Sequence, residues 1–106
     1  MEDYKVRVQI PQVVDLRTAI RLFYEKNELS PKDVREIFGC SAPTAAKLIR
    51  RGQEEMDRTK TPYWNRQNVN SECAFRSWGL DIERMERALT RLRKLRLTEE
   101  ASGGNC

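Results

Sequence analysis

The spacing of helix-start and helix-stop residues between positions 30 and 51 constrains the fold of this chain more than any other feature. Ser30 is a residue type that caps helix N-termini, Pro31 suits the first helical position, and Asp33 completes a capping box. An apolar stripe follows at helical spacing, and Gly39 is a residue type that ends a helix in a left-handed turn. The sequence therefore predicts a helix over residues 31–38.

A second helix start follows directly after that glycine. Ser41 can cap this helix, and Pro43 is tolerated in its first turn, where the backbone N–H groups have no helical partner. Its inward face is formed by Ala45, Leu48 and Ile49. The pattern predicts a helix from Ala42 to about Arg51, joined to the first by about three residues. The charged stretch Gln53–Lys60 is able to extend it.

Three further helices are predicted from the same signals. Asp15 is placed to cap a helix from Leu16 to about Asn27, and a short helix is expected over residues 71–78. Asp81 is placed to cap an amphipathic helix from Ile82 to about Leu97. This last helix either packs against the rest of the chain or joins two copies of it.

The segments between and beyond the helices are predicted as follows. Lys5–Ile10 alternates polar and apolar residues, which indicates a half-buried strand or an extended arm. Residues 61–70 are rich in turn formers and are expected to be a loop whose Tyr63 and Trp64 pack back on the body, with Trp64, like Trp78 further on, as a core anchor. Residues 98–106 are predicted to be a disordered tail. The fold class is thus all-α, with a single domain over residues 1–97.

The composition points away from catalysis and from metal binding. The chain has no histidine, and its three cysteines are far apart, so neither a zinc site nor a disulfide framework is predicted. Cys40 and Cys73 are expected to be buried reduced thiols. The carboxylates of Glu54, Glu55 and Asp57 are interpreted as a charged helix run. With no glycine-rich phosphate loop and no nucleophile–base pair, we expect no enzyme activity and no cofactor.

The location of the protein is predicted from its apolar runs and its N-terminus. The apolar runs are far shorter than the roughly 20 residues that cross a bilayer. The N-terminus is acidic and lacks an apolar stretch, so no signal peptide is expected. We expect a cytoplasmic protein without membrane contact.

Positive charge is concentrated in two places. The net charge is +4, a modest excess that fits a nucleic-acid partner. Three basic residues and no acidic one lie between Lys47 and Arg51, and four basic residues and no acidic one lie between Arg91 and Arg96. The first cluster falls on the second of the two predicted neighbouring helices.

Residues Pro31–Arg50 resemble the helix-turn-helix family of DNA-binding proteins. In that family a glycine sits at the turn, here Gly39, and apolar residues flank it and recur in the second helix. The matching positions are Val34, Phe38, Cys40, Ala45 and Leu48. The sequence departs from the family at Arg35, where a small residue is usual. The resemblance implies two helices locked at roughly 90–120° by these side chains.

The resemblance also implies a partner, double-stranded DNA, and the residues that touch it. The helix from Ala42 to about Arg51 would lie in the major groove. The family's base-facing positions fall on Ser41, Ala42, Pro43, Ala46, Lys47 and Arg50, with Thr44 and Arg51 close enough to help. Lys32 and Arg35 on the preceding helix are candidates for contacts to the DNA backbone.

More widely, the chain looks like small helix-turn-helix proteins of prophages and mobile elements in Gram-positive bacteria. The stretches that carry this likeness are Arg7–Pro11, Leu16–Arg21 and Val69–Asp81. It implies a sequence-specific transcriptional regulator, with homodimer formation as an option. Two alternatives stay open: a DNA-recognition adaptor for packaging, replication or excision, and a protein-interaction module that does not bind DNA.

Overall fold

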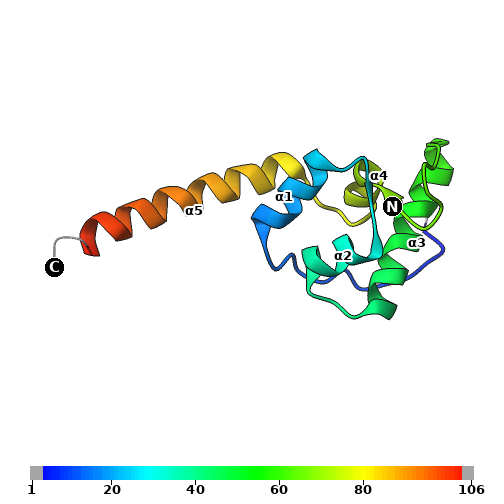
Figure 1. Ribbon diagram of the computed structural model, residues 1–106, viewed down its shortest axis with the longest axis horizontal. Coiled ribbons are helices and arrows are strands. Elements are labelled where there is room, and N and C mark those ends of the chain that lie inside the picture. The colour runs from blue at the N-terminus through cyan, green and yellow to red at the C-terminus, as the bar shows by residue number, and fades with distance from the viewer. Residues whose placement is uncertain (1–3, 104–106) are drawn as a thin grey trace.

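Helices make up most of the protein, as expected for the all-α class. The computed structural model describes residues 4–103, with residues 97–103 described by their backbone alone. Within these residues the elements are α1 (Leu16–Glu25), β1 (Glu28–Leu29), α2 (Pro31–Phe38), α3 (Ala42–Thr59), β2 (Val69–Asn70), α4 (Ser71–Ser77) and α5 (Ile82–Gly103). Figure 1 shows α1 to α4 gathered into one body, from which α5 extends.

The predicted starts of α1 and α2 are confirmed in atomic detail. The Asp15 carboxylate accepts hydrogen bonds from the backbone N–H groups of Arg17 and Thr18, at 3.0 and 3.4 Å. Ser30 and Asp33 form a complete capping box, in which each side chain accepts from the other residue's backbone N–H. These bonds satisfy N–H groups that a helix start leaves without partners.

The start of α3 differs from the prediction in its cap. Ser41 makes no side-chain cap to the helix, and its hydroxyl donates instead to the Thr44 hydroxyl at 3.1 Å. The helix nevertheless begins at Ala42 and continues through the charged stretch to Thr59, where Lys60 adopts a left-handed conformation with φ 56°. α3 is therefore one uninterrupted helix of 18 residues, against which α2, α4 and β2 pack.

One small sheet was not predicted from the sequence. Glu28 and Leu29 pair antiparallel with Asn70 and Val69, respectively. The second strand takes the last two residues of the segment 61–70 that was predicted to be a loop. The pair ties the α1–α2 connection to the start of α4, and it places Leu29 and Val69 in the core, where both are fully buried.

The core lies between α1, α2, α3 and α4. Its buried apolar side chains include Leu22, Ile37, Leu48, Met56, Phe75 and Trp78. The prediction that Trp78 packs in the core is confirmed: its indole N–H donates to the Leu48 carbonyl at 3.0 Å. Phe38 meets Trp78 edge-on, with ring centroids 5.1 Å apart.

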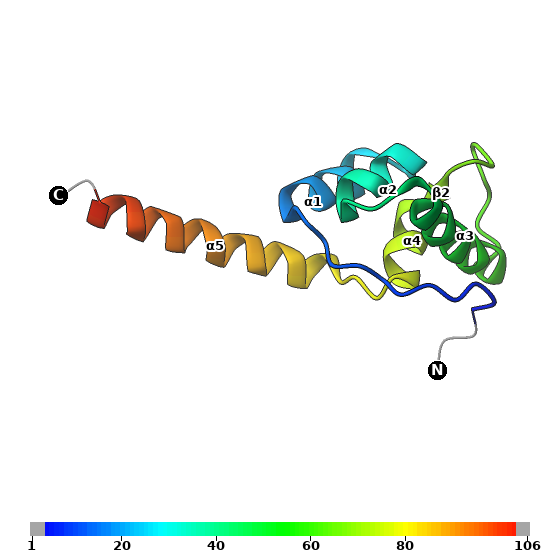
Figure 2. The ribbon, with the colours of Figure 1, turned by 90° about the horizontal axis from the view of Figure 1, so that it is seen from below.

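An N-terminal arm and the C-terminal helix α5 lie on either side of this body. Residues 5–10 are extended and alternate between half-buried and exposed, but they pair with no strand within residues 4–103. They form an arm that passes beside α3 and α4 (Figure 2). α5 runs to Gly103 rather than ending near Leu97, so residues 98–103 are helical where a disordered tail was predicted. Residues 104–106 of that prediction lie outside the described residues.

α5 joins the body only through its first half. Met85 is buried, and the Tyr24 hydroxyl of α1 donates a hydrogen bond to the Glu86 carboxylate. Beyond Thr90 the side chains described on this helix are exposed. None of the helices within residues 4–103 combines the length and apolar character needed to cross a membrane.

Candidate nucleic-acid interface

The connection between α2 and α3 is short and tightly held. Gly39, Cys40 and Ser41 separate the two helices. Gly39 has φ 61°, a left-handed conformation that costs glycine little, and its N–H donates to the Arg35 carbonyl at 2.7 Å. The Arg35 side chain closes the turn from outside, because its Nε donates to the Cys40 carbonyl at 3.3 Å. The position where the family has a small residue thus carries a side chain that folds over the turn.

The outer face of α3 carries exposed positive charge. Pro43, Lys47 and Arg50 are all exposed, and spacings of four and three residues put them on one side of the helix. The opposite side, formed by Ala45, Leu48 and Ile49, is buried against the core. From Ala42 to Gln53 the helix contains three cations and no carboxylate. Lys47 and Arg50 therefore form an exposed basic surface on the first half of α3.

The other predicted contact residues differ in how far they are exposed to solvent. Ser41 and Ala42 are exposed at the start of α3, whereas Thr44 and Ala46 are half-buried. On α2, Lys32 and Arg35 are exposed.

Arg51 differs from its neighbours on α3. It is half-buried, its Nε donates to the Ser77 carbonyl at 2.9 Å, and its guanidinium lies 4.4 Å from the centroid of the Tyr4 ring. A cation over an aromatic face is attracted by the negative charge of that face. Sequence analysis grouped Arg51 with Lys47 and Arg50, but its contacts connect α3 to α4 and to the arm.

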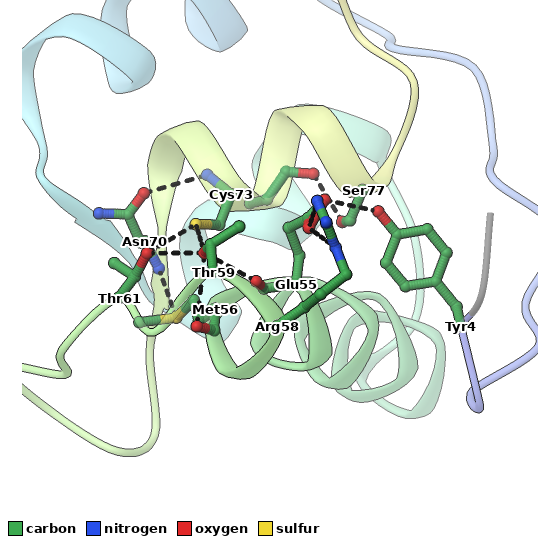
Figure 3. Close-up of polar contacts among 10 residues, drawn as sticks. Tyr4, Glu55, Met56, Arg58, Thr59, Thr61, Asn70, Cys73 and Ser77 are labelled. Carbon is green, nitrogen blue, oxygen red and sulfur yellow. Dashed lines mark hydrogen bonds and ion pairs between the residues drawn. The ribbon is translucent and has the colours of Figure 1, made fainter.

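The arm is held by two of the carboxylates that were interpreted as a charged helix run. The Tyr4 hydroxyl donates to Glu55 at 2.9 Å, and the backbone N–H groups of Lys5 and Val6 donate to Glu54 at 2.8 and 3.0 Å. Glu55 is only 1% exposed, and Arg58 forms an ion pair with it. Figure 3 shows Tyr4 and Arg58 both directed at this buried carboxylate. Glu55 follows Leu48 by seven residues and Gly52 by three, so helical periodicity places it on the buried side of α3, whereas Glu54 is half-buried.

A second segment, the loop of residues 61–68, lies against another side of α3. The Gln53 side-chain amide donates to the carbonyls of Arg66 and Asn68, at 2.9 and 3.0 Å. The expectation that Trp64 packs into the core is wrong, since its side chain is 77% exposed. Tyr63 packs against the core instead and is half-buried.

Two cysteines are free thiols, as expected. Burial raises the pKa of the half-buried Cys40 thiol, which keeps it protonated. Cys73 is buried, and its sulfur lies 3.7 Å from the Thr59 hydroxyl and 3.5 Å from that of Thr61 (Figure 3). Cys106 lies outside the described residues.

The arrangement is thus a basic helix face with an arm on one side and a loop on the other. It exposes cationic side chains that are able to donate hydrogen bonds. A search of protein-family models, of curated proteins and of solved structures finds no match to this chain.

Proposed function

We propose that this protein binds double-stranded DNA, with α2 and α3 acting as a helix-turn-helix and the first half of α3 entering the major groove. The observation that carries the proposal is the exposed basic face of α3, formed by Lys47 and Arg50, which follows a three-residue turn after α2. A helix fits the major groove, which is roughly 12 Å wide. Cations on its outer face meet base acceptors and phosphates there.

Five of the exposed residues have a role in this proposal. Lys47 and Arg50 donate to guanine O6 and N7, and each good bidentate contact is worth about 1–3 kcal/mol of discrimination. Ala42 and Pro43 offer apolar contact to a thymine methyl group. Lys32 on α2 is placed in a phosphate contact that fixes the register of the helix on the duplex.

The biological setting we propose is that of a small cytoplasmic regulator of transcription of the prophage or mobile-element type, without enzyme activity. This part of the proposal is supported by the sequence resemblance of residues 31–50 and of the three further stretches. A packaging, replication or excision adaptor would use the same α3 surface. It would differ in assembly and in sequence preference.

Selection from a pool of random duplexes tests the proposal. Binding is measured at about 50 and about 200 mM salt, where phosphate contacts make affinity fall steeply with salt. The wild-type chain is expected to enrich one sequence, and the Lys47→Ala/Arg50→Ala variant to lose that enrichment. Arg84→Ala/Arg87→Ala, which removes the same charge from exposed positions of α5, is the matched control and is expected to retain it.

The outcomes separate the candidate functions. Binding without enrichment of any sequence would favour the adaptor over the regulator. An absence of binding even at low salt would contradict DNA binding and leave a protein-interaction module. Equal loss in both double variants would show that only net charge matters, which contradicts the role assigned to α3.

We also propose that the chain forms a homodimer through α5. Leu92 and Leu95 are 46% and 55% exposed on the part of α5 that extends from the body. A cleft of about 590 Å³ lies beside Leu92, between this helix and the segment 13–17 that leads into α1. Pairing two copies would cover these leucines, and it would give the two DNA-binding halves that recognise paired half-sites.

A further inference from the structure

The loop of residues 61–68 is fixed in place by several hydrogen bonds. The Glu28 carboxylate accepts from the backbone N–H groups of Trp64 and Asn65, at 2.7 and 3.0 Å. Gln53 holds the other end of the loop through the carbonyls of Arg66 and Asn68. Glu28 is only 8% exposed, so its two bonds are formed in an environment where charge-assisted hydrogen bonds are strong. The loop therefore has one defined conformation.

This fixed loop presents its largest apolar side chain to solvent. Trp64 is 77% exposed, whereas Trp78 is 4% exposed. Tyr63 performs the packing that Trp64 does not, since it lies against the core and its hydroxyl donates to the Gln53 carbonyl at 3.4 Å. The loop thus folds without help from the Trp64 indole. Rigidly presented tryptophans and arginines are the side chains that dominate binding energy at interfaces.

The loop lies next to the proposed DNA-binding face of α3. Gln53, which holds the loop, follows Arg50 by three residues, so the two share one side of the helix a turn apart. α3 has 18 residues and is about 27 Å long, which exceeds the roughly 12 Å width of the major groove. If α3 lies across the groove, the part of the helix beyond Arg50 leaves the groove and passes the sugar–phosphate backbone at its edge.

The charge of the loop matches that backbone. The loop of residues 61–68 contains one basic residue, Arg66, and no acidic one. Arg66 is exposed and follows Trp64 by two residues in the chain, with its guanidinium 5.7 Å from the centroid of the Tyr63 ring. A cation and a large flat apolar side chain on one short loop complement a phosphate and the deoxyribose attached to it.

We infer that the loop is a second DNA-contact element, in which Arg66 binds a backbone phosphate and the Trp64 indole packs on the neighbouring sugar. This inference rests on the proposed function of α3. It adds a contact that depends on duplex backbone rather than on base sequence.

Titrations of the full chain with a fluorescently labelled duplex test the inference. Arg66→Ala and Trp64→Ala are each expected to weaken binding about five- to tenfold, the size expected for loss of one interface anchor. The Arg66→Ala variant is also expected to lower the slope of log affinity against log salt by about one, as loss of one phosphate contact does. Arg87→Ala, an exposed arginine on α5, is the control and is expected to leave affinity and slope unchanged.

Trp64 supplies a direct readout of its own. Because Trp78 is buried, the emission that responds to DNA is expected to come from Trp64 and to disappear in Trp64→Phe. Unfolding midpoints of all variants are measured first. If Trp64→Ala is unstable, the affinity and the salt slope of Arg66→Ala test the loop contact.

The results separate this inference from the proposed function. If both loop variants bind as the wild type does while Lys47→Ala/Arg50→Ala does not, the loop contact is overturned and α3 keeps its role. If the wild-type chain binds no duplex at low salt, both are overturned.

Discussion

Gly52 shows how closely α3 is packed against its neighbours. A Cβ atom at this position would lie 2.5 Å from Cγ2 of Val69 and 3.2 Å from the Cα of Ala74. The first distance is too short for two carbon atoms, and the second is tight and involves backbone that cannot turn aside. In an exposed helix interior, alanine is better than glycine by about 1 kcal/mol. Here the missing side chain is what lets α4 and β2 approach α3.

We expect Gly52→Ala to destabilise the protein in spite of alanine's helix propensity. Overpacking of a filled core costs about 1–3 kcal/mol, which outweighs the propensity gain of about 1 kcal/mol. The free energy of unfolding is measured in urea. Gly79→Ala is the comparison: it meets no atom within 4 Å, so only its φ of 72° opposes alanine. A Gly52→Ala variant more stable than the wild type would contradict the close approach.

The starts of α1 and α2 depend on ionised aspartates. Burial by itself would raise the pKa of Asp33, but the Ser30 N–H and the Lys26 ammonium, 2.9 Å away, lower it. The hydrogen bond from the Thr18 hydroxyl is the main cause of the lowered pKa of Asp15. A carboxylate with a depressed pKa in the folded state stabilises the fold above its ordinary pKa, and that stability is lost as the pH falls.

We therefore expect the unfolding midpoint to fall as the pH is lowered from about 5 to about 2, the interval in which such carboxylates become protonated. Asp33→Asn should start from a lower midpoint and lose less over this interval, because its side chain cannot be protonated there. Thermal unfolding followed by circular dichroism measures both. Glu36→Gln changes an exposed carboxylate of the same helix and serves as the control. An acid dependence that is the same in Asp33→Asn and in the wild type would refute the role of this cap.

The helices could be predicted from sequence because their signals are local. Asp15, Ser30 and Asp33 act on N–H groups within three residues, and Gly39 acts through its own φ, so short stretches suffice to place α1 and α2. The short turn and the exposure of Lys47 and Arg50 follow from the same periodicity.

The contacts of the arm and of the loop could not be predicted because their partners are distant in sequence. Tyr4 and Glu55 are 51 residues apart, and Trp64 and Glu28 are 36 apart. Arg51 directly follows Arg50 in the sequence, yet its contacts with the Ser77 carbonyl and the Tyr4 ring hold its side chain away from the outer face of α3. Trp64 was expected inside because tryptophan usually is, but Tyr63 occupies the contact with the core.

α5 gives the molecule its elongated shape, with extents of 55 × 28 × 24 Å. Its outer part carries apolar side chains, which favour pairing of two copies, and basic side chains, which oppose it. Leu92 and Leu95 gain by being covered, whereas Arg91, Arg93, Lys94 and Arg96 repel their counterparts when two copies meet. The Debye length is about 10 Å at 0.1 M salt, so this repulsion is screened as salt rises.

The proposed homodimer and the proposed DNA complex should consequently respond to salt in opposite directions. We expect the dimer measured by sedimentation equilibrium to strengthen between about 50 and about 200 mM salt, the same range over which DNA binding weakens. Leu92→Ala/Leu95→Ala should weaken the dimer at least about tenfold, since each copy loses two apolar contacts. Thr90→Ala, an exposed change on the same helix, should leave it intact.

A wild-type chain that sediments as a monomer at both salt concentrations would contradict the dimer while leaving DNA binding by α3 as a separate question. A dimer unaffected by the leucine variant would show that the two copies meet through another surface.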